Sequence, residues 1–289
     1  MRGSVLYDVP GPRARARNRV LSVVGLLLVA GLAWLVYSRF DAHGQWDGAK
    51  WKPFVQASTW TTFILPGLRS ALTAAGIAIV LALAFGVIFA VGRLSAHRWL
   101  RWPSGVVVEF FRGIPLLILI FFASYGAPFV LHRDVPALWA VVFGLTLYNG
   151  SVLAEAFRAG ILALPRGQTE AAYAVGLRKG QVMRLILVPQ AARAMLPVIV
   201  SQLVVLVKDT ALGYIIAYPE LLAQVNVISA NFSNLVQAAI VVGAVYIVVN
   251  LALGQLARLL ERRFAPGRLS RATVAAQDAV IASTMGRAG

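Results

Sequence analysis

Two oppositely charged residues stand side by side in an otherwise apolar stretch of this sequence. Lys208 and Asp209 lie toward the end of the apolar segment at about 190–214. Charges within apolar helices are costly, so they indicate either a functional site or a nearby partner charge. An adjacent cation and anion can complement the ammonium and the carboxylate of an amino acid. The alternatives are salt bridges to neighbouring helices and side chains that extend to the polar surface. Because adjacent helical residues point about 100° apart, both charges need not face one cavity.

Uncharged polar residues also lie deep in two apolar segments, namely Tyr148, Asn149, Ser201 and Gln202. These side chains could line a pathway for a polar molecule, or they could form hydrogen bonds between helices. Hydrogen bonding between helices is the simpler interpretation, and the sequence leaves both open.

Two pairs of opposite charge share a spacing of three residues, Glu109 with Arg112 and Glu155 with Arg158. Residues with this spacing lie on one face of a helix, so each couple can form an ion pair. Both couples stand near the inner ends of apolar segments. We interpret them as structural pairs or as parts of a gate.

The composition indicates the environment of these residues. Of 289 residues, 59% are hydrophobic and 13% are charged, whereas soluble domains are about 45–50% apolar and about 25% charged. Part of the apolar surface is therefore expected to face lipid. The absence of cysteine excludes disulfides and cysteine metal sites. The histidines His43, His97 and His132 all fall in expected loops, so we expect no metal site.

Six apolar segments are long enough to cross the bilayer, which takes about 20 helical residues. The sequence therefore predicts an all-α polytopic membrane protein, with helices at about 20–38, 68–92, 105–131, 136–160, 190–214 and 233–257. The first segment is too long for the core of a cleaved signal peptide, so we expect it to be retained. Barrel strands are about 10 residues long and alternate in polarity, unlike these segments.

Basic residues predict the orientation of the helices. The net charge of +16 would suggest nucleic-acid binding in a soluble protein. Here the basic residues lie between apolar runs, which favours membrane topology and no nucleic-acid partner. With the N-terminus in the cytoplasm, 21 of the 27 Lys and Arg residues fall in cytoplasmic segments and three in outer loops. We therefore expect both termini to be cytoplasmic.

One predicted membrane helix has small residues at every fourth position: Ala74, Ala78, Ala82, Gly86 and Ala90. This spacing places them on one helix face, where another helix can approach closely. The alternative is chance in an alanine-rich chain. We favour a packing face.

The largest predicted cytoplasmic loop carries a spaced motif. It contains Glu170-Ala171-Ala172, then Gly176, Ile186 and Val188-Pro189. Thr169 can cap a short helix there, Gly176 can end it in the left-handed conformation, and Pro189 suits the first turn of the next helix. The small alanines permit close approach of another protein.

This loop resembles the E-A-A loop of ABC importer permeases. Their pattern is E-A-A, three residues, Gly, nine residues and I-x-L-P, and the sole departure here is Val188 in place of Leu. The resemblance implies that Glu170, Ala171, Ala172, Gly176 and Pro189 form a coupling loop that docks a cytoplasmic ATPase. The alternative is an ordinary amphipathic helix at the membrane surface.

The resemblance extends to polar amino acid permeases over about residues 60–260. It rests on segments such as Glu109-Phe-Phe-Arg112-Gly113-Ile114-Pro115, Glu155-Ala-Phe-Arg158 and Lys208-Asp209-Thr210. The opening residues and the extra first helix resemble the glutamate-type permease subunit of actinobacterial systems. Ile114 and Leu119 depart from the pattern, since many relatives have Thr and Gln there, which weakens the transfer of substrate contacts.

The resemblance implies a type I permease core of five helices at 60–262, with the coupling loop at 166–189. Residues 1–59 would add a cytoplasmic tail, a peripheral membrane helix and an outer loop, and 263–289 a basic, mobile tail. The implied partners are an ATPase dimer, a second permease subunit and an extracellular substrate-binding protein. A different second subunit is favoured over a second copy of this chain.

The implied function is the import of a polar amino acid, with glutamate favoured over basic or other polar amino acids. No G-x-x-x-x-G-K-[ST] loop occurs, so ATP and magnesium are expected on the separate ATPase, and this chain is expected to bind no cofactor. An ion-coupled carrier would work without an ATPase and often shows inverted repeats. A membrane enzyme would need a reactive constellation, and the sequence shows none.

Overall fold

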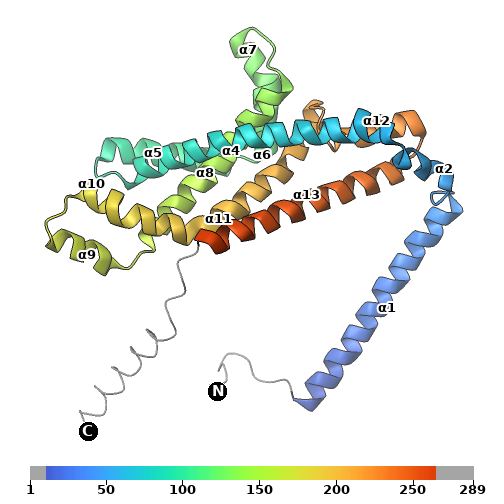
Figure 1. Ribbon diagram of the computed structural model, residues 1–289, viewed down its shortest axis with the longest axis horizontal. Coiled ribbons are helices and arrows are strands. Elements are labelled where there is room, and N and C mark those ends of the chain that lie inside the picture. Colours follow the sequence, from blue (N-terminus) through green and yellow to red (C-terminus); the bar gives the residue numbers. More distant parts are fainter. Residues whose placement is uncertain (1–10, 265–289) are drawn as a thin grey trace.

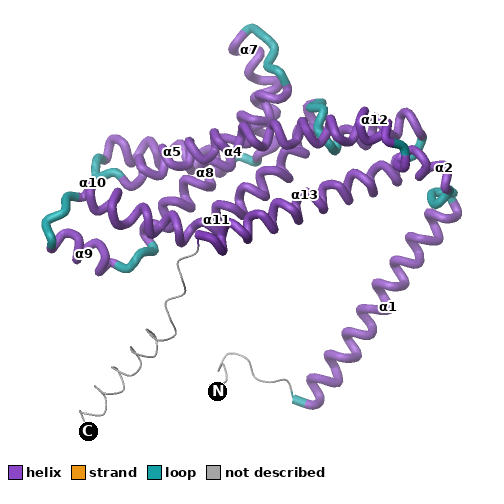
Figure 2. Tube along the Cα trace, in the orientation of Figure 1, coloured by secondary structure: helices purple, strands orange, loops and turns teal. Residues whose placement is uncertain are grey.

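The computed structural model describes residues 11–264, and every regular element in this range is helical (Figures 1 and 2). This confirms the all-α prediction. The α-helices are α1 (Pro12–Ala42), α2 (Gly48–Trp51), α3 (Ala57–Thr59), α4 (Leu65–Leu94), α5 (Arg98–Gly113), α6 (Leu116–Phe121), α7 (Ala127–Leu131), α8 (Ala137–Leu162), α9 (Arg166–Ala174), α10 (Lys179–Val182), α11 (Val188–Asp209), α12 (Ala223–Phe232) and α13 (Leu235–Phe264). The predicted basic tail lies outside the described residues from 265 onward.

Within the described residues, five helices are long and apolar enough to cross a membrane, and a bent pair gives up to six spans. The helix predicted at 105–131 corresponds to this bent pair and is not continuous. The chain bends by 99° between α5 and the helical run that begins with α6. Pro115 explains the break, because proline disfavours the helical conformation of the residue before it. Ile114 is accordingly extended, with φ −89° and ψ 131°.

Three helical runs contain a π turn, and each π turn is followed by a proline two residues after its end. The π turns are η2 (Trp60–Ile64), η3 (Phe122–Gly126) and η4 (Met183–Leu187), and the prolines are Pro66, Pro128 and Pro189. Proline lacks the N–H of the helical hydrogen bond, and its ring clashes with the carbonyl one turn earlier. A widened turn relieves that clash. The runs therefore continue through their prolines.

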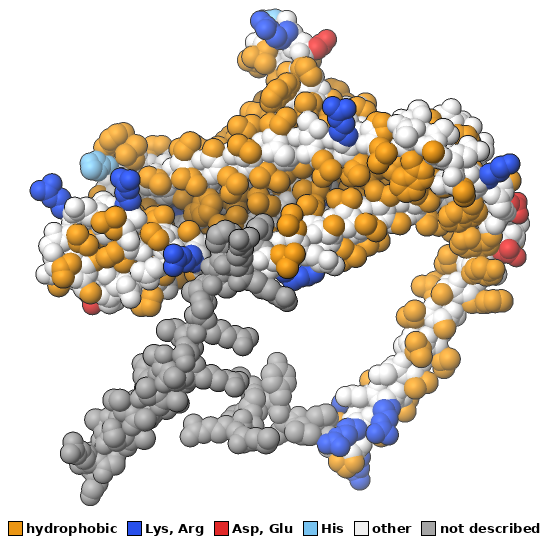
Figure 3. All heavy atoms as spheres, in the orientation of Figure 1, with side chains coloured by type: hydrophobic (Ala, Val, Ile, Leu, Met, Phe, Trp, Pro, Cys, Tyr) orange, Lys and Arg blue, Asp and Glu red, His pale blue; other side chains and the backbone are white. Residues whose placement is uncertain are grey.

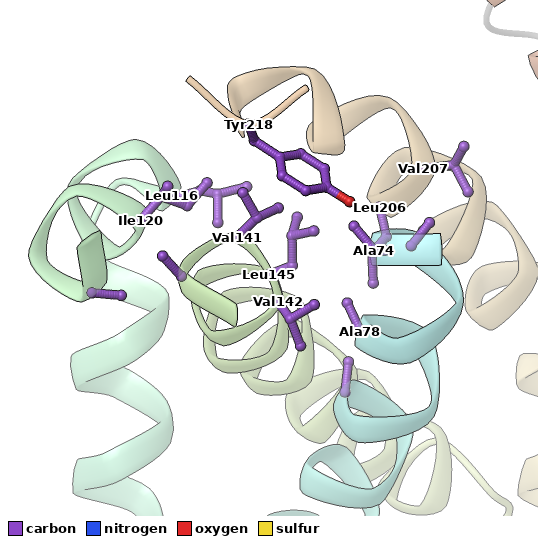
Figure 4. Close-up of a cluster of buried hydrophobic side chains, with 14 of the residues drawn as sticks. Ala74, Ala78, Leu116, Ile120, Val141, Val142, Leu145, Leu206, Val207 and Tyr218 are labelled. Carbon is purple, nitrogen blue, oxygen red and sulfur yellow. The ribbon is translucent and has the colours of Figure 1, made fainter. Parts of the chain in front are cut away.

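The core is built around the crossing of α4 and α8. The small-residue face of α4 is buried, with Ala74, Ala78 and Ala82 fully inaccessible. Figure 4 shows Ala74 and Ala78 facing a cluster that includes Val142 and Leu145 of α8. Residues of α6 and α11 and Tyr218 close the cluster. The four-residue spacing therefore marks a packing face.

We expect Gly86→Ile to destabilise the protein strongly. A Cβ atom at Gly86 would lie 2.9 Å from Leu153 Cβ and 3.3 Å from the Gly150 carbonyl oxygen. Overpacking of this kind costs about 1–3 kcal/mol, so the thermal midpoint in detergent should fall. Gly76→Ile, on the same helix with no atom within 4 Å of its added Cβ, is the matched control. Equal midpoints for the two variants would contradict the packing.

The helix α1 stands apart from the bundle, and none of its residues is buried (Figure 1). The loop after it is fastened to the beginning of α13, since Asn234 Nδ2 donates to the Lys50 carbonyl oxygen at 3.0 Å. Gln237 Nε2 likewise donates to the carbonyl oxygen of Gln45. Hydrophobic side chains cover α1 and much of the visible face of the bundle, and Lys and Arg gather mainly toward its ends (Figure 3). The helix α1 therefore lies outside the packed bundle.

Candidate functional site

The segment around α9 ends in a complete glycine cap. The Gly176 N–H donates to the Tyr173 carbonyl at 2.9 Å, and the Leu177 N–H donates to the Ala172 carbonyl at 3.2 Å. Gly176 has φ +81°, in the left-handed region. These are the two bonds of a Schellman motif, which pairs the last carbonyls of a helix. Gly176 therefore ends α9 in the conformation predicted from the sequence.

The helix α9 is anchored by one of its alanines. Ala172 is buried in a cluster with Val182 and Leu187, against which Ile161 of α8 also packs. Its neighbours Glu170 and Ala171 are exposed. Ala172 therefore packs α9 against α8, α10 and η4 and is not itself open to a partner.

Other residues of the α9 segment are exposed. Tyr173 is 48% exposed and Val175 is 76% exposed, and both stand next to the exposed Glu170 and Ala171. We call the exposed residues Glu170, Ala171, Tyr173 and Val175 the free face of α9, where Val175 is the residue directly after the helix. An exposed tyrosine and valine on a short helix suit contact with another protein.

One detail of the predicted loop is wrong, and the structure adds to another. The helix α9 begins at Arg166, directly after Pro165, so Thr169 lies inside it and does not cap it. Pro165 explains this start, since proline favours the position just before or at the first turn of a helix. The next helix begins at Lys179, and Pro189 is accommodated inside that continuous run by the η4 π turn. Pro189 therefore stands in the first turn of α11, as predicted, and the π turn before it joins α11 to α10 without a break.

The predicted charge pairs lie in one network. Glu109 and Arg112 are 2.6 Å apart and Glu155 and Arg158 are 3.0 Å apart. Arg93 joins the two pairs, with one nitrogen 3.3 Å from Glu109 and another 2.5 Å from Glu155. The network therefore ties the ends of α4 and α5 to α8.

The bridging role of Arg93 could not be predicted from the sequence, in which this residue indicates only membrane topology. Its side chain is 13% exposed, less than that of any other member of the network. The available indication of a charged partner was the position of Arg93, one residue before the end of a long apolar helix. The distance from Arg93 to Glu155 could not be predicted, because the two residues are remote along the chain.

The structure does not bring Lys208 and Asp209 to one cavity. Lys208 is exposed and lines a cavity of about 550 Å³ together with Tyr246 and Asn250 of α13. Asp209 is the last residue of α11 and is absent from that lining. Among the described residues, none forms an ion pair with Lys208, and the Asn250 Oδ1 atom is buried without a hydrogen bond. The cavity thus offers the Lys208 cation, whereas the Asn250 oxygen is inaccessible.

The uncharged polar residues divide into two groups. Gln202 Nε2 donates to Asn149 Oδ1 at 2.7 Å, and this bond joins α11 to α8. Asn149 is fully buried, so the bond also satisfies an otherwise costly amide. Tyr148 packs against the main core cluster, whereas Ser201 is exposed. Asn149 and Gln202 therefore stabilise the contact between α8 and α11, and Ser201 remains accessible.

A buried carboxylate that the sequence analysis did not single out lies before α12. Glu220 accepts hydrogen bonds from the Leu222 and Ala223 N–H groups, each at 2.8 Å, and from Tyr246 Oη at 2.5 Å. Burial raises the pKa of Glu220, and its hydrogen bonds to Tyr246, Leu222 and Ala223 oppose that rise. The available indication of this role was the position of Glu220 directly after Pro219 and shortly before a helix, where a carboxylate can accept hydrogen bonds from backbone N–H groups. Glu220 ties the beginning of α12 to α13.

Comparison with known proteins identifies the family. Residues 82–266 match the family model described as the binding-protein-dependent transport system inner membrane component. The glutamate transport system permease protein GluD of Corynebacterium glutamicum is 46% identical over 240 residues, which cover 81% of this chain and 87% of that protein. The chain belongs to this family of membrane transport components. Its fold and its apolar helices are those of a permease component.

Other relatives of this transport component agree with that assignment. The probable glutamine ABC transporter permease protein GlnP of Bacillus subtilis is 36% identical and covers 70% of this chain and 93% of the relative. A solved structure described as an amino acid ABC transporter with histidines matches with a TM-score of 0.68 and 28% identity, over 73% of this chain and 98% of that chain. An inward-facing MetNI methionine ABC transporter matches with a TM-score of 0.61 at 17% identity, over 73% of this chain and 100% of that chain, which shows the fold alone.

Proposed function

We propose that this chain is the membrane-spanning permease subunit of an ATP-driven importer for glutamate. The observation that carries the proposal is the free face of α9. The glycine cap at Gly176 ends the helix, and the buried Ala172 packs it against the rest of the protein. The 46% identity to a glutamate permease supports the substrate. Relatives named for arginine and glutamine make basic and other polar amino acids the alternatives.

The orientation follows from the distribution of basic residues. We place the α9 end of the bundle and both termini in the cytoplasm, because 21 of the 27 Lys and Arg residues then lie inside. The opposite end, which carries α2 and α12 (Figure 1), then faces outward. There an extracellular binding protein would deliver the substrate. A second, different permease subunit would complete the pathway.

In this proposal the partner ATPase binds ATP and magnesium and contacts the free face of α9. The Ala172 cluster connects α9 to α8 and to the beginning of the α11 run, so a displacement of α9 is passed to both helices. The Asn149–Gln202 hydrogen bond joins the same two helices farther along. Nucleotide binding can thus shift the population between inward-facing and outward-facing states.

The substrate test uses the complex of this chain with its partner subunits in proteoliposomes. Uptake of labelled glutamate is measured in competition with unlabelled glutamate, aspartate, glutamine, arginine and histidine. We expect the acidic amino acids to compete best. Stronger competition by arginine or glutamine than by glutamate would show that the importer prefers amino acids with basic or amide side chains.

We expect Lys208→Gln to raise the KM for glutamate about tenfold, because a hydrogen bond to a charged group contributes about 1.5–3 kcal/mol. Maximal uptake and the amount of ATPase that co-purifies should be unchanged. Arg133→Gln removes an exposed cation in a loop outside this cavity and is the control. If both variants keep the KM of the unmodified protein, Lys208 does not contact the substrate.

A further inference from the structure

A cavity with four arginines lies beside α5, toward the α9 end of the bundle. Its volume is about 560 Å³, and its lining includes Arg93, Arg98, Arg101 and Arg158. Glu109 is the carboxylate among the residues that line it. The transport cycle proposed above gives this cavity no role.

The positive charge of the cavity is only partly compensated. Arg93 and Arg158 belong to the network in which Glu109 and Glu155 are already paired. By contrast, no described residue forms an ion pair with Arg98 or Arg101. A cavity lined by unpaired cations concentrates anions. The chemistry of the site therefore favours an anionic ligand.

Two tryptophans indicate that this ligand has an apolar part. Trp99 is 70% exposed and Trp102 is 68% exposed, and both stand in the first turns of α5 beside the arginines. Trp102 and Val106 also line the cavity. Exposed tryptophans next to arginines are typical of helices at the membrane interface. A freely soluble anion would make little use of these apolar groups, whereas a lipid would contact them.

We propose that this cavity binds the headgroup of an anionic phospholipid. Arg98 and Arg101 bind the phosphate, and Trp102 and Val106 contact the glycerol and the beginning of an acyl chain. The proposal rests on the proposed orientation, which places the α9 end at the negatively charged cytoplasmic leaflet. A bound lipid would fix α5 against the network that joins it to α4 and α8.

The test measures lipid bound to the full-length chain, purified with the partner subunits that accompany it. Native mass spectrometry follows titration with phosphatidylglycerol or phosphatidylcholine of matched acyl chains. We expect phosphatidylglycerol to bind more tightly. The double variant Arg98→Gln/Arg101→Gln should bind phosphatidylglycerol about thirtyfold more weakly, since two basic residues are lost near the membrane surface. Size-exclusion chromatography checks that it remains folded.

The control is Arg184→Gln/Arg193→Gln, which removes two exposed arginines of η4 and α11 that do not line the cavity. It should bind phosphatidylglycerol as the unmodified chain does. Equal binding of the two lipids, or equal loss of binding in both double variants, would overturn the site. Displacement of the lipid by inorganic phosphate would identify a soluble-anion site instead. The experiment measures lipid binding and no transport, so its outcome can be distinguished from a failure of the proposed import function.

Discussion

Replacement of Gly176 by valine should abolish ATP-driven uptake while the protein still inserts into the membrane. No atom lies within 4 Å of a Cβ atom added at Gly176, so the effect is one of backbone conformation alone. A β-branched residue at φ +81° is strained by about 1–3 kcal/mol. The chain can relieve that strain by losing the Schellman motif, which would displace the free face of α9. Uptake into proteoliposomes and the yield of inserted protein are the two measurements.

A graded series distinguishes conformation from bulk at this position. Gly176→Asn should keep much of the uptake, because asparagine tolerates the left-handed conformation better than other residues with a side chain. Gly180→Val is the matched control in the same loop, since its added Cβ also meets no atom and its φ is not positive. Full uptake with Gly176→Val would remove α9 from the coupling mechanism.

Replacement of Arg93 by methionine should be the most destabilising change among the charged residues. It leaves Glu155, which is 27% exposed, without the nearer of its two cations. Breaking a buried ion pair on one side costs about 3–5 kcal/mol, and partial exposure reduces that figure to about 1–3 kcal/mol here. The thermal midpoint in detergent should therefore fall clearly below that of the unmodified protein.

Two further variants test the cause of this loss. Arg112→Met removes a more exposed cation, with a side chain 41% exposed, from the same network and should cost less than about 1 kcal/mol. The double variant Arg93→Met/Glu155→Met should recover part of the stability, because an apolar pair can replace a buried ion pair. If Arg93→Met is as stable as Arg112→Met, the ion pairs of Arg93 with Glu109 and Glu155 contribute little to the stability of the protein.

Features that depend on neighbours in sequence could be predicted. The left-handed Gly176, the packing face of α4 and the number of apolar segments each follow from a residue type at a short, regular spacing. The break at Ile114–Pro115 is also local, yet hydropathy missed it because the apolar run continues on both sides of the proline. The break was therefore encoded in Pro115 rather than in the hydrophobic pattern.

Features that depend on distant segments could not be predicted. Arg93 meets Glu155 because α4 and α8 cross closely at Gly86 and Gly150, and no local pattern gives that pairing. The exposure of Lys208 to the cavity, rather than of Asp209, follows from where α13 packs, which the sequence of α11 does not contain. The buried Ala172 and the exposed Ala171 look alike in sequence, and the packing of α10 and η4 separates them.

The most direct test of the account asks which surface of this chain contacts the ATPase. The chain contains no cysteine, so a single Ala171→Cys variant can carry a photoactivatable maleimide on the free face of α9. Val55→Cys, where the native side chain is 87% exposed near the opposite end of the bundle, is the control. After irradiation of the purified complex, the account predicts an adduct between position 171 and the ATPase and none from position 55. An intact complex in which position 171 gives no ATPase adduct, or in which position 55 gives one, would contradict it.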